Sequence, residues 1–388
     1  MNTLTLTTGG HHITLHTDTA HITDWARTYF TAHWPEAPEP ATATGPLVTA
    51  LHHGPPLDHD RPHTHHTVYA RDHLTYTPHP DGTVTARNRT HPALTYRYTP
   101  AHQHLEITHT GPDQPDHHDP CTLATATTRF TRHLLHAQLT ANGWTLLHAS
   151  AAIHPTGHGV LALGGPGAGK TTTALTLATT RAALLATDCC YARPNPRGTL
   201  DLLPWPAATT IGLGLLDALG WTSTVRERLK AGEPPHPTQH PSVTHALTTG
   251  TTRPLYAADG RERKAQLWPH QLQHWFRLTL TPHATADRIL QTRIDPAADT
   301  PRTCPPEQPG HDVFTTGPGR YPDIFGLTHH QKTPAHRQQV VRHLRTLPHH
   351  SLILGHQHST NTMLIHQTST SAPVAQCRPA RPFPPDST

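Results

Sequence analysis

Residues 159–188 read GVLALGGPGAGKTTTALTLATTRAALLATD, and this stretch decides the expected fold class. Its loop, Gly164–Thr171, fits the pattern GxxxxGK[ST], in which main-chain amides approach phosphate oxygens and a lysine reaches the β- and γ-phosphates. An apolar, strand-like run, Gly159–Leu163, precedes the loop, and a helical pattern, Lys170–Thr180, follows it. The order strand, glycine loop, helix and second apolar run predicts an α/β nucleotide-binding unit.

The loop also predicts how the nucleotide, expected to be ATP, is held. The helix that begins near Lys170 adds the positive end of its dipole to the amides of the loop. Lys170 is expected to contact the β- and γ-phosphates, and the Thr171 hydroxyl is expected to coordinate Mg²⁺. The expected phosphate-binding residues are Gly164, Gly165, Pro166, Gly167, Ala168, Gly169, Lys170, Thr171 and Thr172.

An acidic residue, Asp188, follows the apolar run Ala182–Ala186. A carboxylate at the carboxyl end of a strand beside a phosphate loop can bind Mg²⁺ or accept the proton of an attacking hydroxyl. We expect Asp188 to be both a metal ligand and a catalytic residue. A place in a surface turn is the alternative, and Asp295 is the rival acid.

His148 is the second candidate for proton transfer. The sequence places it on a strand, Trp144–Ile153, that is expected to form a hairpin with the strand feeding the glycine loop. That position favours a catalytic role, whereas the 40 histidines of the chain favour a structural one. The sequence does not decide between the catalytic and the structural role.

Several cations could neutralise the charge that builds on a transferring phosphoryl group. The run Arg261, Arg263 and Lys264 is expected to bind the nucleotide. Arg253 and Arg293 are further candidates, and the spacing does not decide which of the five contacts phosphate.

Composition excludes several classes of protein. The formal net charge is +4, without a dense Lys/Arg block, so we expect no nucleic-acid partner. Neither a signal peptide nor a run of about 18–20 apolar residues is visible, so we expect a soluble, cytoplasmic protein without a membrane partner. Histidine is spread over the chain together with Thr and Pro, and a metal site at His63–His66 is not favoured.

The chain is expected to divide into an N-terminal α+β domain, 1–120, a nucleotide-binding domain, 121–370, and a disordered tail, 371–388. The boundary follows a Pro-rich linker, Gly111–Pro120. Two further segments are rich in proline: Ala231–Pro241 is expected to be mobile, and Thr300–Gly310 is expected to be a loop.

The residues together resemble a known family. The segments 144–151 (WTLLHASA), 159–171 (GVLALGGPGAGKT) and 184–188 (LLATD) look like the catalytic core of HPr kinase/phosphorylase and its smaller relatives, the actinobacterial HPr kinase-like ATP-binding proteins. The resemblance implies a P-loop kinase core with a β-rich sheet, in which His148, Lys170 and Asp188 serve catalysis. The family has two adjacent acids where this chain has Thr187 and Asp188. Its C-terminal signature is not visible, so neither HPr nor phosphorylase activity is inferred.

These observations predict an ATP- and Mg²⁺-dependent kinase that transfers the γ-phosphate to a hydroxyl acceptor. The acceptor could be a peptide Ser/Thr or a small hydroxylated metabolite, for example in a natural-product or peptide-modification pathway. The alternative is an ATP-binding regulatory or partner-binding protein with little or no phosphotransfer, and the single acid Asp188 favours it. Homo-oligomerisation is left open.

Overall fold

The computed structural model describes residues 1–37, 45–52, 54, 64–69, 72–110, 120–314, 323–327 and 333–371. These residues form a mixed α/β protein with several sheets, so the α/β class is confirmed at that level. Most of the expected linker Gly111–Pro120, nearly all of the tail 371–388, and His63 lie outside the described residues.

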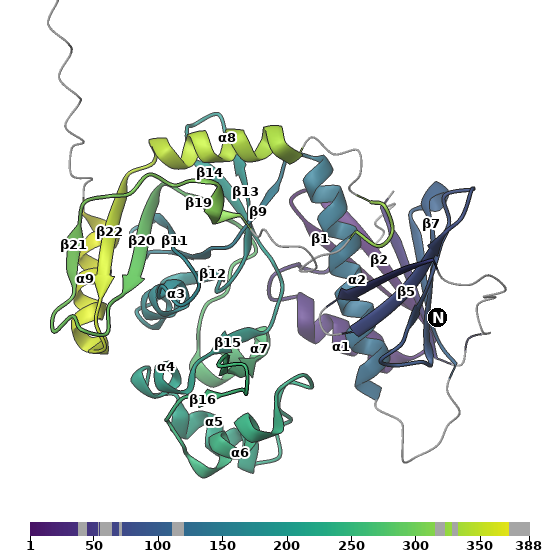
Figure 1. The fold of residues 1–388 in the computed structure, drawn as a ribbon, viewed down its shortest axis with the longest axis horizontal. Coiled ribbons are helices and arrows are strands. Elements are labelled where there is room, and N and C mark those ends of the chain that lie inside the picture. The colour runs from purple at the N-terminus through teal and green to yellow at the C-terminus, as the bar shows by residue number, and fades with distance from the viewer. Residues whose placement is uncertain are drawn as a thin grey trace, which may run out of the picture.

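The N-terminal part is an eight-stranded sheet in the order β1-β2-β3-β8-β7-β6-β5-β4. Helices α1 (Ala20–Phe30) and α2 (Pro120–Ala141) pack on its β1, β2, β3 and β8 end (Figure 1). In β1 and β2, buried apolar residues alternate with mostly half-buried polar ones, as a sheet covered on one face requires. The strands of the sheet are β1 (Asn2–Thr8), β2 (His11–Thr17), β3 (Leu47–His52), β4 (His65–Tyr69), β5 (Asp72–Pro78), β6 (Val84–Asn88), β7 (Leu94–Thr99) and β8 (His104–His109).

Helix α2 shares its core with this first sheet. Leu123, Phe130 and Leu139 pack in one cluster with Leu4, Tyr96 and the other apolar side chains of the sheet. The division of the chain at residues 120 and 121 stays a prediction, but the layer that α2 covers belongs to the N-terminal part.

The glycine loop belongs to a six-stranded sheet in the order β12-β10-β11-β20-β22-β21. Strands β11, β20 and β22 run parallel, whereas β10 lies antiparallel between β11 and β12. Helix α3 (Lys170–Thr179) packs on β10, β11 and β12, and α9 (His358–Thr370) packs beside α3. The strands are β10 (Ser150–Ile153), β11 (Gly159–Leu163), β12 (Ala183–Ala186), β20 (Arg288–Ile294), β21 (Arg302–Cys304) and β22 (His349–Leu354).

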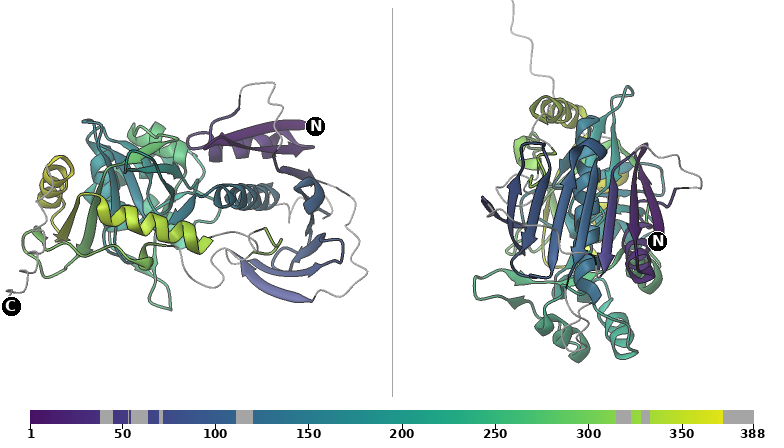
Figure 2. Two further views of the ribbon diagram at one scale, coloured as in Figure 1. Left: turned by 90° about the horizontal axis from the view of Figure 1, so that it is seen from above. Right: turned by 90° about the vertical axis from the view of Figure 1, so that its right-hand side faces the viewer.

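A four-stranded sheet, β19-β14-β13-β9, packs against strands β10, β11 and β12 of the six-stranded sheet. Helix α8 (Thr333–Thr346) covers it (Figures 1 and 2). The strands of the four-stranded sheet are β9 (Thr145–Leu147), β13 (Cys190–Pro194), β14 (Leu200–Pro204) and β19 (Ala284–Ala286). A smaller, mostly helical block fills residues 209–276. It contains β15 (Thr209–Ile211), α4 (Leu213–Ala218), α5 (Thr222–Lys230), α6 (Pro241–Thr249), β16 (Leu255–Tyr256), β17 (Glu262–Arg263), β18 (Ala265–Leu267) and α7 (Pro269–Phe276).

Side chains of the N-terminal part make hydrogen bonds across to the second part. Trp34 Nε1 donates to the Pro204 carbonyl at 3.2 Å, and Arg132 Nη1 donates to the Pro206 carbonyl at 2.6 Å. His136 Nδ1 lies 3.1 Å from the Tyr191 hydroxyl. We call this set of contacts the seam.

Two local expectations were wrong. The strand Trp144–Ile153 is broken into β9 and β10, which belong to different sheets, so only β10 and β11 form the hairpin. The loop expected at Thr300–Gly310 contains the edge strand β21, which pairs antiparallel with β22. Its position at an edge explains how a Pro-rich segment can supply a short strand.

Candidate functional site

The loop between β11 and α3 has backbone conformations that require glycine. Gly164 has φ +146°, and a Cβ there would lie 2.5 Å from the Thr292 carbonyl oxygen. Gly169 has φ +94°, and a Cβ there would press on Ile294 and Leu354. The loop therefore lies tightly against the ends of β20 and β22.

Lys170 is buried at the start of α3. Its Nζ donates hydrogen bonds to the carbonyls of Gly164 at 2.8 Å and Gly165 at 2.9 Å. The ammonium group is thus folded over the loop that would surround a phosphate. Lys170 is 6% exposed, so the positive charge of its ammonium group is shielded from water.

Thr171 and Asp188 lie on the same side of the loop. The Thr171 hydroxyl donates to the Thr187 carbonyl at 2.9 Å, and the same carbonyl accepts from the Ser150 hydroxyl at 2.7 Å. These bonds hold the end of β12, and with it Asp188, next to the first turn of α3. Both expected metal ligands offer the oxygen donors that Mg²⁺ prefers, so the residues fit that ion.

His148 lies between β9 and β10, beside Asp188. Its Nε2 is 3.3 Å from Asp188 Oδ1, and its main-chain amide donates to the Val313 carbonyl at 2.8 Å. The imidazole is 18% exposed and the carboxylate 49% exposed, so the pair borders open space. The rival acid, Asp295, instead accepts from the Ala297 amide in a turn after β20.

These residues surround one cavity of about 480 Å³. Its lining brings together the loop from Pro166 to Thr172, His148 and Asp188. The carbonyls of Gly164 and Gly165 support the loop because they accept the hydrogen bonds of the Lys170 side chain. A cavity of this size matches the usual range for small-molecule sites, about 300–1,000 Å³.

Of the expected cations, the structure places Lys264 in the lining of this cavity. Lys264 Nζ is 3.8 Å from Glu262, which also lines the cavity. Arg261 is 87% exposed and paired with Asp259, and Arg263 donates to the Ser242 hydroxyl at 3.1 Å. The lining contains neither of these arginines, nor the exposed Arg253 and Arg293.

Sequence reasoning missed the wall formed after β22. Gly355, His356 and His358 line the cavity there. Asn361 fixes this turn, because its side chain accepts from the Gly355 amide at 3.0 Å and donates to the Gly355 carbonyl at 2.8 Å. Burial lowers the pKa of His358. The available signal was the apolar run ending at Leu354, since the carboxyl ends of parallel strands meet at one edge of a sheet.

Residues 231–240 form a loop that ends where α6 begins at Pro241, and parts of this loop are buried. His236 and Gln239 are 8% and 9% exposed, and the Gln239 side chain accepts from the Gln266 amide at 2.9 Å. This loop thereby holds β18 in place beside the cavity.

Neither metal clusters nor membrane spans are evident in the described structure. No three His, Cys, Asp or Glu side chains of the described residues gather as a metal site. No helix within the same ranges is long and apolar enough to cross a bilayer.

Comparisons with known proteins add no assignment. No protein-family model matches the chain, and no curated protein matches it.

Proposed function

We propose that this protein is an ATP- and Mg²⁺-dependent kinase with an HPr kinase-like core, which transfers the γ-phosphate to a hydroxyl acceptor. The observation that carries the proposal is the shared cavity of the glycine loop, Lys170, Thr171, Asp188 and His148. Strand β10, which lies antiparallel between β11 and β12, supports the proposal. The resemblance to HPr kinase implies a β-rich sheet whose strands are not all parallel.

Each residue has a role in the proposed reaction. The loop amides and Lys170 bind the phosphates, and Lys264 adds a second positive charge in the same cavity. Mg²⁺, when bound by Thr171 and Asp188, would neutralise the charge of the phosphates.

The transfer is a substitution at phosphorus. The bond from the γ-phosphorus to the β,γ-bridging oxygen breaks, a bond to the acceptor oxygen forms, and ADP leaves. The hydroxyl proton passes to the Asp188 carboxylate, whose position is fixed by His148 at 3.3 Å.

The alternative is an ATP-binding regulatory protein with little or no phosphotransfer. The observation favouring it is the single acid at the end of β12, where Thr187 occupies the preceding position and faces Thr209 across 3.1 Å. A hydroxyl cannot replace a carboxylate as a base at neutral pH.

The test begins with nucleotide binding by the full chain. ATP with Mg²⁺ should raise the Tm of the wild type, and Lys170→Ala should abolish the rise. Lys230→Ala, which removes an exposed lysine on α5, is the matched control and should retain it. An unchanged rise in Lys170→Ala would refute the assignment of the loop.

Phosphotransfer separates the two functions. Labelled γ-phosphate should pass from ATP to a component of an extract of the source cells, and Lys170→Ala should abolish the transfer. ATP binding without any labelled product would favour the regulatory protein.

A further inference from the structure

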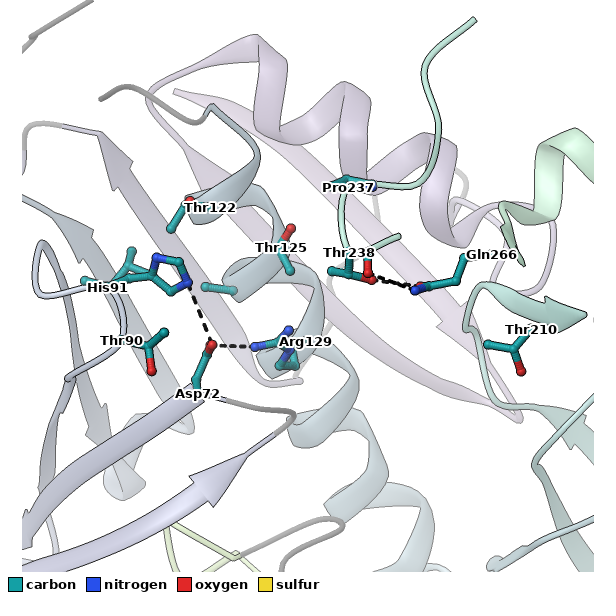
Figure 3. Close-up of a pocket in the computed structure, with 12 residues that line it drawn as sticks. Asp72, Thr90, His91, Thr122, Thr125, Arg129, Thr210, Pro237, Thr238 and Gln266 are labelled. Carbon is teal, nitrogen blue, oxygen red and sulfur yellow. Dashed lines mark hydrogen bonds and ion pairs between the residues drawn. The ribbon is translucent and has the colours of Figure 1, made fainter. Parts of the chain in front are cut away.

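A second cavity, of about 580 Å³, lies where the first sheet and α2 face the strand pair β15–β18 (Figure 3). Asp72, His91, Thr125 and Arg129 line it from the N-terminal part. Threonines and glutamine line it from the other side, and none of the roles assigned above uses this cavity.

The second cavity adjoins the nucleotide cavity. Thr210 on β15 belongs to the lining of both. Lys264 lines the nucleotide cavity and Gln266 lines the second one. Two residues of extended chain span at most about 7 Å, so a small molecule in the second cavity can reach toward the phosphates.

The wall at Asp72 has an oxygen placed to accept a hydrogen bond. Asp72 Oδ2 accepts from Arg129 Nη1 at 2.6 Å and from Asn88 Nδ2 at 3.1 Å. Within the described part of the chain, the partner of Oδ1 is His91 Nε2, 3.8 Å away, which is too long for a hydrogen bond. One ligand hydroxyl could therefore bond both Oδ1 and the imidazole.

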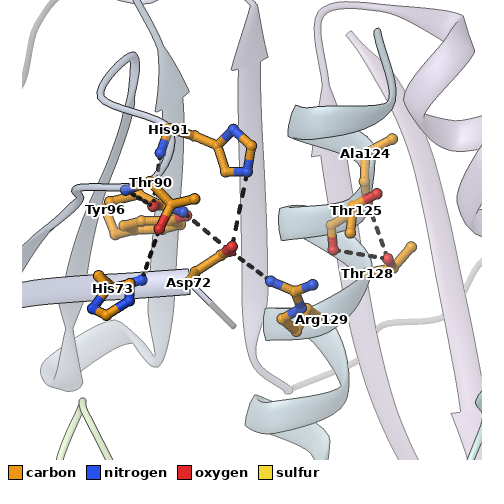
Figure 4. Close-up of polar contacts among 10 residues, drawn as sticks. Asp72, His73, Thr90, His91, Tyr96, Ala124, Thr125, Thr128 and Arg129 are labelled. Atoms are coloured by element: carbon orange, nitrogen blue, oxygen red, sulfur yellow. Dashed lines mark hydrogen bonds and ion pairs between the residues drawn. The ribbon is translucent and has the colours of Figure 1, made fainter. Parts of the chain in front are cut away.

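This wall is fixed by its own hydrogen bonds (Figure 4). The side-chain oxygen Oδ1 of Asn88 accepts from the main-chain amides of Thr90 at 2.9 Å and His91 at 3.0 Å. The Thr90 hydroxyl accepts from the His73 amide at 3.0 Å. Asn88 is fully buried, so it ties the turn that carries His91 to the carboxylate of Asp72.

The opposite wall is also held in place. The Thr238 hydroxyl donates to Gln266 Oε1 at 2.8 Å, and Gln266 Nε2 donates to the Thr238 carbonyl at 2.9 Å (Figure 3). Thr210 and Gln266 are cross-strand partners. A ligand would thus enter between two walls that already have their shape, which lowers the entropic cost of binding.

The side chains of the lining indicate which chemical class of ligand the cavity can bind. Among the described residues of the lining, the charged side chains are Asp72 and Arg129, which form an ion pair of opposite charges, and the other polar groups are hydroxyls, an amide and the His91 ring. These described residues offer many hydrogen bonds and equal numbers of positive and negative charges, which suits an uncharged ligand with several hydroxyl groups.

We propose that this cavity binds the phosphate acceptor, and that the acceptor is a small uncharged molecule with several hydroxyl groups. The inference rests on the proposed kinase function. A polypeptide is disfavoured because the cavity has the volume of a small-molecule site rather than the length of a strand groove.

The experiment uses the full chain, γ-labelled ATP and three pools from an extract of the source cells. The pools are polypeptides, small molecules retained by ion exchangers, and small molecules that pass through both exchangers. Thr125→Trp fills the cavity from a half-buried position on α2. Thr249→Trp, on an exposed position of α6 away from both cavities, is the matched control.

We expect label in the uncharged small-molecule pool, at least tenfold less with Thr125→Trp, and unchanged with Thr249→Trp. ATP should raise the Tm of all three proteins, which shows that the variants fold and bind nucleotide. His91→Ala, a half-exposed position, is the milder second variant and should raise the KM for the labelled acceptor with little change in kcat.

The outcomes separate the two proposals. Label confined to the polypeptide or charged pool, or undiminished labelling by Thr125→Trp and His91→Ala, would overturn the acceptor assignment while leaving a kinase. No label in any pool, with the ATP-induced rise in Tm intact, would overturn the kinase function itself and this inference with it.

Discussion

His148 and Asp188 face each other because the chain crosses between the same two sheets at both residues. His148 separates β9 from β10, and Asp188 lies between β12 and β13. Strand β10 pairs with β12 and β9 pairs with β13, so the two crossings run side by side in opposite directions. This register, rather than nearness in sequence, brings Nε2 and Oδ1 to 3.3 Å.

The first prediction concerns this pair. Asp188→Asn should lower the rate of phosphotransfer by about 10²–10⁴-fold, the usual contribution of a general base. His148→Gln should lower it less, because His148 acts by positioning the carboxylate. The rates are measured at saturating ATP, and ATP-induced stabilisation serves as the check of folding. Equal rates for Asp188→Asn and the wild type would remove Asp188 from catalysis.

The second prediction tests the choice among the cations. Lys264→Met should weaken ATP binding about tenfold or more, because it removes a positive charge from the nucleotide cavity. Arg261→Met should leave binding unchanged, since Arg261 is exposed and paired with Asp259. Calorimetric titration with ATP measures both. A larger effect at Arg261 than at Lys264 would contradict the arrangement described here.

The third prediction uses two adjacent glycines. Gly164→Ala should lower the free energy of unfolding by at least about 1–2 kcal/mol, because the new Cβ meets the Thr292 carbonyl at a positive φ. Gly165→Ala should cost much less, because a Cβ there has open space and φ is not positive. Chemical denaturation compares them. Equal losses would mean that the loop is not packed on β20 in this way.

The fourth prediction concerns the wall after β22. Asn361→Ala removes both hydrogen bonds to Gly355 and should destabilise the protein by about 2–3 kcal/mol, since two buried main-chain groups lose their partner. ATP affinity should fall as well, because Gly355 and His356 line the nucleotide cavity. Asn142→Ala, on an exposed residue after α2, is the control and should change neither property.

The fifth prediction is a loss of stability in mild acid. Burial lowers the pKa of His33, His133 and His236 to about 4, and that of His136 to about 3. In the unfolded chain these groups titrate near 6.5, so between pH 6.5 and 4 the unfolded state binds more protons than the folded state. Their contribution to stability is complete above pH 6.5 and is lost as the pH falls.

A His33→Phe variant tests this account. It removes one group that must be charged on unfolding, so its Tm should fall less steeply than that of the wild type between pH 6.5 and 4. If the two slopes agree, protonation of His33 is not coupled to unfolding.

The sequence predicted the glycine loop and its flanking elements well because their signals are local. Glycines with positive φ, an apolar run before them and a helical pattern after them all lie within residues 159–180. The turn at Pro80-Asp81-Gly82 is likewise set by local residues, as Gly82 has φ +82° and Asp81 accepts from the Thr83 amide.

Other elements could not be predicted because the contacts that stabilise them leave no pattern in the sequence. Helix α9 has few apolar residues, and its threonines bond back to its own carbonyls, as Thr362 does to His358 and Thr368 to Leu364. The break between β9 and β10 depends on a change of sheet, which is a tertiary event. Neither signal is carried by the spacing of apolar residues.

The individual residues that line the second cavity could not be predicted from the sequence either. Asp72 and Arg129 are far apart in the chain and meet only because α2 packs beside the first sheet. Asp72 follows a polar stretch of the sequence, and nothing in its neighbours distinguishes it from the other acids.

The seam has a consequence for selectivity. Trp34, Arg132 and His136 tie the N-terminal part to residues 191–206, and these bonds would have to break for the wall at Asp72 to move away from the glycine loop. In a kinase of the proposed kind, the fixed separation between that wall and the γ-phosphate would select acceptors by their length. The reactive hydroxyl would have to lie at that distance from the end of the acceptor that the wall binds. Homologous polyols one carbon longer or shorter would then be poor substrates.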